Sequence, residues 1–186
     1  EVVKRLHLTV NYSVREGLRT ADLYGRSPIE VDFINDNSKQ KLSLEVTPLR
    51  NGKIELTDFE DKFVTRQETK RVILAEYGDT VATPVGQVVV HKTLFMDSTY
   101  LKKPITVIKN SLAATTNAYR AAVKSDVANK QASIVTISMN NSVPRRAEDV
   151  INTLIAVYEE DAIADKRQLS VVTADFIKER MQVIGR

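Results

Sequence analysis

The chain has 186 residues, of which 42% are hydrophobic and 27% are charged, and its formal net charge is +3 at pH 7. This length is enough to bury a hydrophobic core as one domain or as two closely joined domains. Basic residues are interspersed with acidic ones, which argues against a nucleic-acid-binding protein. The chain contains no cysteine, which excludes disulfides, zinc–thiolate sites and thiol catalysis.

Membrane segments are not visible in the sequence. No apolar run reaches the roughly 20 residues that a transmembrane helix needs, and no signal peptide is recognisable. The chain begins with Glu1, and we expect it to be an excised part of a longer protein. Its neighbouring segments would then hold any membrane helices.

The first half of the chain reads mainly as strands. Short runs rich in Val, Ile, Leu, Thr and aromatic residues alternate with turn-forming residues, and Asn51-Gly52 is a strong hairpin signal. Seven runs at short spacing predict an antiparallel sandwich or barrel-like module. The runs cover residues 7–12, 27–34, 41–49, 53–59, 61–67, 70–77 and 86–93.

The pattern changes after Tyr100. Pro104 can begin a helix, and the apolar residues that follow it at helical spacing predict a helix to about Thr116. Residues 133–139 (SIVTISM) predict a buried strand. We expect residues 119–124 to pair with it as a second strand.

A long amphipathic helix is predicted from Val143 to Arg186, where Asn141 or Ser142 can cap it and Pro144 fits its first turn. Such a helix would be about 65 Å long at 1.5 Å per residue. No large apolar side chain lies between Ile163 and Leu169, so we expect the first half to pack on a core and the second half to project and contact another helix or subunit. The packing residues are Val150, Ile151, Leu154 and Tyr158, and the projecting ones are Leu169, Val172, Phe176 and Ile177.

Motifs for catalysis are missing from the sequence. It has no phosphate-binding loop, no dinucleotide-binding glycine motif and no nucleophile elbow. His7 and His91 lack the spacing of metal ligands. The acidic run 159–161 does not converge on a helix, because successive residues point about 100° apart. We therefore expect no catalytic, cofactor or metal site in this chain.

Two basic pairs remain as candidate contacts for an acidic polymer or partner. They are Lys102-Lys103 and Arg145-Arg146. The second pair is unusual, because positive charge at a helix N-terminus opposes the helix dipole. The alternative for both pairs is an ordinary solvated surface.

Three stretches together resemble a known family. They are KKPITVIKNSL, SIVTISMNNSVPRRAEDVINTLIAVYEED and the upstream LRTADLYGRSPIEVDF. A strand ending in Ile137-Ser138 followed by a spaced helix motif is similar to the periplasmic region of the polysaccharide co-polymerase or chain-length-determinant (Wzz-type) family. The upstream stretch resembles the version in capsular exopolysaccharide tyrosine autokinases (Wzc-type), particularly of Bacteroides-like bacteria. The helix motif residues are Pro144, Ala147, Asn152, Leu154 and Tyr158.

The resemblance implies an α+β fold. An alpha/beta base with a long C-terminal helix would comprise residues 1–28 and 91–186, and an inserted antiparallel, jelly-roll-like β-sandwich would comprise residues 29–90. Transmembrane helices outside the chain would flank it on the periplasmic side of the bacterial inner membrane. Any tyrosine kinase domain would also lie outside.

The function implied by the resemblance is non-catalytic. Such regions form homo-oligomeric rings that regulate the chain length and export of capsular or exopolysaccharide, in communication with an outer-membrane export channel. We expect this chain by itself to be monomeric or weakly associated. One alternative is a glycan-binding module that grips the polysaccharide through its sandwich; a polysaccharide hydrolase or lyase is a third hypothesis, for which no carboxylate pair stands out.

Overall fold

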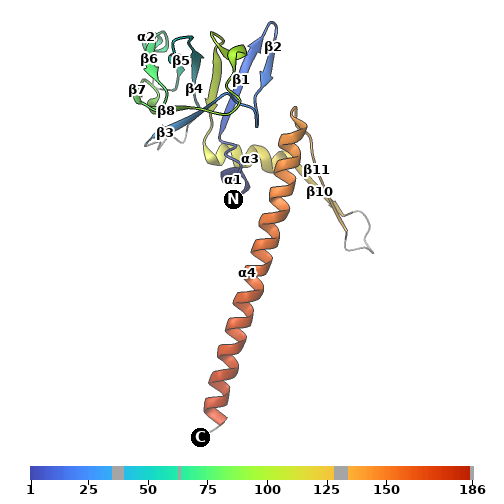
Figure 1. Ribbon diagram of the computed structural model, residues 1–186. Coiled ribbons are helices and arrows are strands. Elements are labelled where there is room, and N and C mark those ends of the chain that lie inside the picture. The colour runs from blue at the N-terminus through green and yellow to red at the C-terminus, as the bar shows by residue number, and fades with distance from the viewer. Residues whose placement is uncertain (35–39, 63, 128–133, 185–186) are drawn as a thin grey trace. The chain divides into compact units, whose positions relative to one another are not determined.

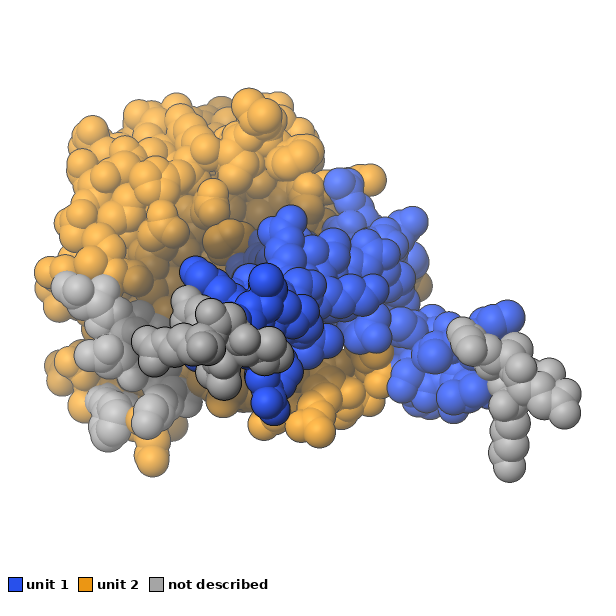
Figure 2. Space-filling view, turned by 90° about the horizontal axis from the view of Figure 1, so that it is seen from below, with its two compact units in different colours: residues 1–6, 124–186 blue, residues 7–123 orange. Residues whose placement is uncertain are grey.

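A computed structural model describes residues 1–34, 40–62, 64–127 and 134–184. It divides into two compact units, which Figure 2 shows in orange and blue. The orange unit comprises residues 7–123, and the blue unit comprises residues 1–6 and 124–186.

A six-stranded antiparallel sheet forms the larger part of the 7–123 unit (Figure 1). Its strand order is β2-β1-β9-β4-β5-β6, so β9 lies between β1 and β4. The strands are β1 (Val10–Glu16), β2 (Arg19–Asp22), β4 (Leu42–Pro48), β5 (Lys53–Glu60), β6 (Ile73–Glu76) and β9 (Ile105–Lys109).

A second, three-stranded antiparallel sheet has the order β3-β8-β7. Its strands are β3 (Ile29–Ile34), β7 (Thr80–Thr83) and β8 (Gly86–Lys92). The unit also contains two short helices, α2 (Arg66–Thr69) and the 3-10 helix η1 (Ser98–Tyr100), and the longer helix α3 (Leu112–Ala122).

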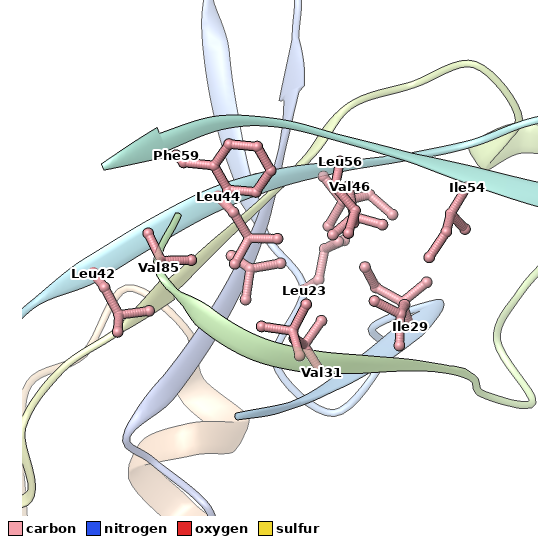
Figure 3. Packing of buried hydrophobic residues seen from close by; sticks show 14 of the residues in the cluster. Leu23, Ile29, Val31, Leu42, Leu44, Val46, Ile54, Leu56, Phe59 and Val85 are labelled. Atoms are coloured by element: carbon pink, nitrogen blue, oxygen red, sulfur yellow. The ribbon is translucent and has the colours of Figure 1, made fainter. Parts of the chain in front are cut away.

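The two sheets share one hydrophobic core (Figure 3). Alternate residues of β4 and β5, such as Leu44 and Leu56, face Ile29 and Val31 of β3, and all four are buried. This period-2 burial is what the alternating sequence runs predicted. The core is the main source of stability for this unit, because its aliphatic side chains are removed from water almost completely.

The helix predicted from Pro104 is wrong. Residues 105–109 form strand β9, in which Ile105 and Val107 are buried between β1 and β4. Ile-Thr-Val-Ile is a β-branched run that favours a strand. The helix begins later: Ser111 caps α3 by accepting a hydrogen bond from the N–H of Ala114 at 3.2 Å.

Two predicted strands are also corrected. Residues 119–122 belong to α3, and the strand that pairs with β11 (Val135–Met139) is β10 (Val123–Val127). β11 is mainly exposed, where a buried strand was predicted, and Ser133 lies outside the described residues.

The strand predicted at residues 61–67 is not formed by the described residues: those before Arg66 are in neither helix nor strand, and helix α2 begins at Arg66. Phe63 lies outside the described residues. Thr65 and Glu68 form a capping box at the start of α2: the N–H of Thr65 donates to the Glu68 carboxylate at 2.9 Å. The sequence carried this signal as Thr-x-x-Glu.

The smaller unit contains α1 (Val2–Arg5), the β10–β11 pair and α4 (Pro144–Ile184). Helix α4 has 41 residues, and Figure 1 shows it as one uninterrupted helix. At 1.5 Å per residue it is about 60 Å long, which confirms the predicted long C-terminal helix.

The mixed α+β fold with antiparallel sheets and a long C-terminal helix is as predicted. The division of the chain differs. Strands β4 to β6, which were assigned to an inserted module of residues 29–90, lie in the same sheet as β1 and β9, which were assigned to the base. The unit boundaries fall instead at residues 6/7 and 123/124.

Candidate assembly surface on the long helix

The start of α4 is fixed by local hydrogen bonds. The side-chain oxygen of Asn141 accepts a bond from the N–H of Val143 at 2.9 Å, so one of the two expected capping residues contributes here. Pro144 is the first residue of the helix, where the missing N–H of proline costs nothing.

One face of the first turns of α4 is buried. Arg146 and Val150 are only 7% and 2% exposed. Val157 and Leu154 continue this face and are half-buried. Within its unit, α4 contacts β11 and α1.

A second apolar face runs along the helix; it is exposed except at Ile151 and Ala162, which are half-buried. Val150 lies on the buried face. Ile151 is the next residue, so its side chain points about 100° away from that of Val150 and lies on the second face. Tyr158, predicted to pack on the core, is 73% exposed on this stripe, and Leu169 is 68% exposed. We call this surface the outer stripe: Ile151, Ile155, Tyr158, Ala162, Leu169, Val172 and Phe176.

The spacing of the outer stripe is that of a helix-pairing seam. With Asp165 included, its members follow one another at alternating intervals of four and three residues from Ile151 to Phe176. This is the heptad pattern by which two or more helices pack along their length. Ile177, also predicted to contact a partner helix, is exposed beside this seam.

Two charged residues modify the seam. Asp165 occupies a position where an apolar side chain would complete it. The Arg180 guanidinium lies 5.4 Å from the centre of the Phe176 ring, a cation–π distance that holds the ring along the helix.

The β10–β11 pair adds a further exposed apolar surface to the same unit. Val127, Ile134 and Val135 are all largely exposed. An isolated two-stranded ribbon is marginally stable in water. The unit therefore presents apolar side chains on both its helix and its strands.

An ion pair attaches the N-terminal helix to α4. Both terminal nitrogens of Arg5 donate to the Glu160 carboxylate, at 2.9 and 2.6 Å, and its Nε donates to Glu1 at 3.2 Å. The bond from Arg5 lowers the pKa of Glu160. Because the ion pair is bidentate, it fixes the side of α4 that faces α1. The outer stripe lies on a different side of α4.

The four predicted basic contacts differ in exposure and belong to different units. Lys102 and Arg145 are exposed, Lys103 is half-buried and Arg146 is buried. Burial of Arg146 does not fit a role as a surface contact for a polymer. Lys102 and Lys103 belong to the 7–123 unit, whereas Arg145 belongs to the other.

Four of the five helix-motif residues, all except Asn152, lie within about 80° of one another around α4, between the buried face at Leu154 and the outer stripe at Tyr158. Ala147 and Leu154 are half-buried, whereas Asn152 and Pro144 are exposed together with Tyr158. The motif therefore contributes to both faces of the helix.

Comparisons with known proteins add no family. No protein-family model matches the chain, and no curated protein matches it. Within the described residues, none of the helices has a stretch both long and apolar enough to cross a bilayer, and no group of three or more His, Asp or Glu side chains is placed to bind a metal ion.

Proposed function

We propose that this chain is a non-catalytic assembly domain of a bacterial polysaccharide co-polymerase, located on the periplasmic side of the inner membrane. In this proposal it forms homo-oligomers through α4 and so regulates the chain length and export of capsular or exopolysaccharide. In this proposal the two sheets that share a core form a jelly-roll-like sandwich that includes β1, β2 and β9 as well as strands of residues 29–90.

The outer stripe is the observation that carries the proposal. Leu169 and Phe176 are more than half exposed, in line with Ile155 and Tyr158 on the same face. Such a row of large apolar side chains on a projecting helix is typical of contacts with other helices. The helix provides a long surface for association.

Disulfide cross-linking tests the assembly directly, because the chain has no cysteine of its own. We would introduce Leu169→Cys on the outer stripe of the membrane-embedded protein to which the proposal assigns this chain. Oxidation should give covalent dimers, since equivalent stripes face one another between subunits. The matched control is Val171→Cys, which is similarly exposed but lies about 200° around the helix.

The two variants separate the possible results. Dimers from Leu169→Cys with few from Val171→Cys support assembly through the outer stripe. Equal cross-linking of both, or none at either position, contradicts it. Loss of long polysaccharide chains in a Leu169→Glu/Phe176→Glu strain, with normal protein levels, would connect the stripe to polymer length.

A further inference from the structure

One end of the six-stranded sheet brings three connections together. Val14 of β1 and Val46 of β4 both pair with Ile105, the first residue of β9. The β1–β2 turn, the β4–β5 turn and the segment entering β9 therefore lie at the same end of the sheet. Figure 1 shows β1 and β2 joined at this end, at the top of the view.

The segment entering β9 is fixed against the β4–β5 turn. The N–H of Lys102 donates to the carbonyl of Pro48 at 2.8 Å. Lys102 has a φ of 62°, which is uncommon for a residue other than glycine. Its backbone is thus held in one conformation beside the neighbouring turn, and its side chain is exposed.

Positive charge gathers at this end. All the basic residues there are exposed except Lys103, which is half-buried. The acidic residues at this end include Glu16, Asp79 and Asp97, which are exposed, and Glu76, which forms an ion pair with Lys53 at 3.3 Å, so basic residues outnumber acidic ones there. The basic residues, which we call the basic end, are Arg15, Arg19, Arg50, Lys53, Lys102 and Lys103.

Large apolar side chains project from the same end. Leu18, at the tip of the β1–β2 turn between Arg15 and Arg19, is 100% exposed. Leu94 is also fully exposed, and Phe95 beside it is half exposed. Leu94 and Phe95 belong to the segment that runs from the end of β8 at Lys92 to Lys102. At its start, the Nζ atom of Lys92 lies 4.5 Å from the ring centre of Tyr77, which directly follows β6.

We propose that the basic end binds the surface of an anionic lipid bilayer, with Leu18 entering the interface and the flanking arginine and lysine side chains contacting lipid phosphates. Basic residues near an anionic leaflet are attracted to it electrostatically, and salt screens this attraction. An apolar side chain beside them adds binding free energy when it moves from water into the lipid interface. The inference does not depend on assembly through α4.

The apolar tips favour a lipid surface over an acidic glycan as the ligand. Leu18 and Leu94 are fully exposed and offer a glycan no hydrogen bond, whereas in a lipid interface both side chains would leave water. A leucine fully in water between two arginines matches the amphipathic character of membrane-surface segments.

Vesicle co-sedimentation of the 186-residue chain tests this. We expect binding to phosphatidylcholine vesicles that contain phosphatidylglycerol, little binding to phosphatidylcholine alone, and weakening by salt. Lys102→Asn, which tolerates the positive φ, should weaken binding about fivefold, since each basic residue near the surface contributes a similar factor. Leu18→Ser should weaken it roughly tenfold.

The controls lie at the opposite end of the same sheet. Lys41→Gln, just before β4, and Leu112→Ser, at the first residue of α3, remove the same side-chain types away from the basic end and should leave vesicle binding unchanged; Leu112 is 42% exposed. Equal losses in the control variants, or equal binding to vesicles without phosphatidylglycerol, would overturn the proposal. A third result would also overturn it: the chain binds soluble alginate but no vesicles, and Leu18→Ser and Lys102→Asn abolish the alginate binding. The ligand would then be an acidic glycan.

Discussion

The phenolic oxygen of Tyr12 accepts a hydrogen bond from the backbone N–H of Val31 at 2.9 Å. Tyr12 lies on β1 of the six-stranded sheet, and Val31 lies on β3, an edge strand of the three-stranded sheet. The bond therefore joins the two sheets and provides an acceptor for a backbone N–H of the buried residue Val31 on an edge strand.

Tyr12→Phe should lower the free energy of unfolding by about 1–3 kcal/mol, because it leaves the Val31 N–H buried without an acceptor. Urea unfolding followed by circular dichroism measures the change. Tyr158→Phe, at an exposed tyrosine, is the matched control and should have no effect. A loss no larger than that of the control would show that the bond contributes nothing to the fold.

The same tyrosine predicts an alkaline transition. Burial raises the pKa of Tyr12 to about 12, helped by the charges of Glu30 and Asp32 and opposed by the bond from Val31. Because the folded-state pKa lies above the unfolded value of about 10, stability is fully present below pH 10 and falls as pH rises towards 12, by on the order of 2 kcal/mol.

Absorbance titration of tyrosinate, together with thermal unfolding at each pH, measures this transition. The slope of stability against pH in this range should be smaller in Tyr12→Phe than in the natural sequence. Identical slopes would mean that Tyr12 ionises as readily in the folded chain as in the unfolded one.

A carboxyl pair on the outer face of the six-stranded sheet predicts a different pH effect. Burial raises the pKa of Glu45, and the nearby Asp58 raises it further, while a bond from the Thr106 hydroxyl at 3.2 Å opposes the shift. A raised folded-state pKa means that Glu45 contributes most to stability below its unfolded pKa and that this contribution is lost as pH rises through the folded pKa.

Glu45→Gln should therefore raise the melting temperature at neutral pH and have little effect in acid. The gain should stay below about 1 kcal/mol, because water screens a half-exposed carboxylate. Thermal unfolding of both proteins from about pH 3 to pH 7 covers the titration range of a carboxyl group. A constant difference at every pH would exclude this charge effect.

How far the sequence predicts the fold differs between β9 and α4. Residues 105–112 fit helical spacing through Ile105, Ile108 and Leu112, and they fit strand alternation equally well over their first four residues. These residues form a strand because they pair with β1 on one side and β4 on the other. That pairing is a tertiary feature that no local sequence pattern contains. The length and periodicity of α4, in contrast, are local and were sufficient.

The sequence predicted that the second half of α4 is exposed, but it did not predict which face of the first half is buried. The pattern identified Leu169, Val172 and Phe176 as partner contacts, and these side chains are exposed on one face. It grouped Val150 with Tyr158, although burial follows the face of Arg146 and Val150. Which of two apolar faces is covered depends on what packs against the helix, and periodicity alone cannot determine it.

Asp165 provides the sharpest test of the seam. Its carboxylate occupies a position within the outer stripe, between Ala162 and Leu169, where association would bring it towards a partner helix. A polar residue at one such position typically lowers the stability of a helix assembly while fixing its register. Asp165→Leu should therefore increase self-association of the chain, measured by sedimentation velocity over a range of concentrations.

The control is Asp175→Leu. Asp175 is also exposed but lies about 120° from the stripe, so this substitution removes the same charge and should leave association unchanged. Equal increases in both variants would attribute the effect to general hydrophobicity and would remove the outer stripe as the assembly surface.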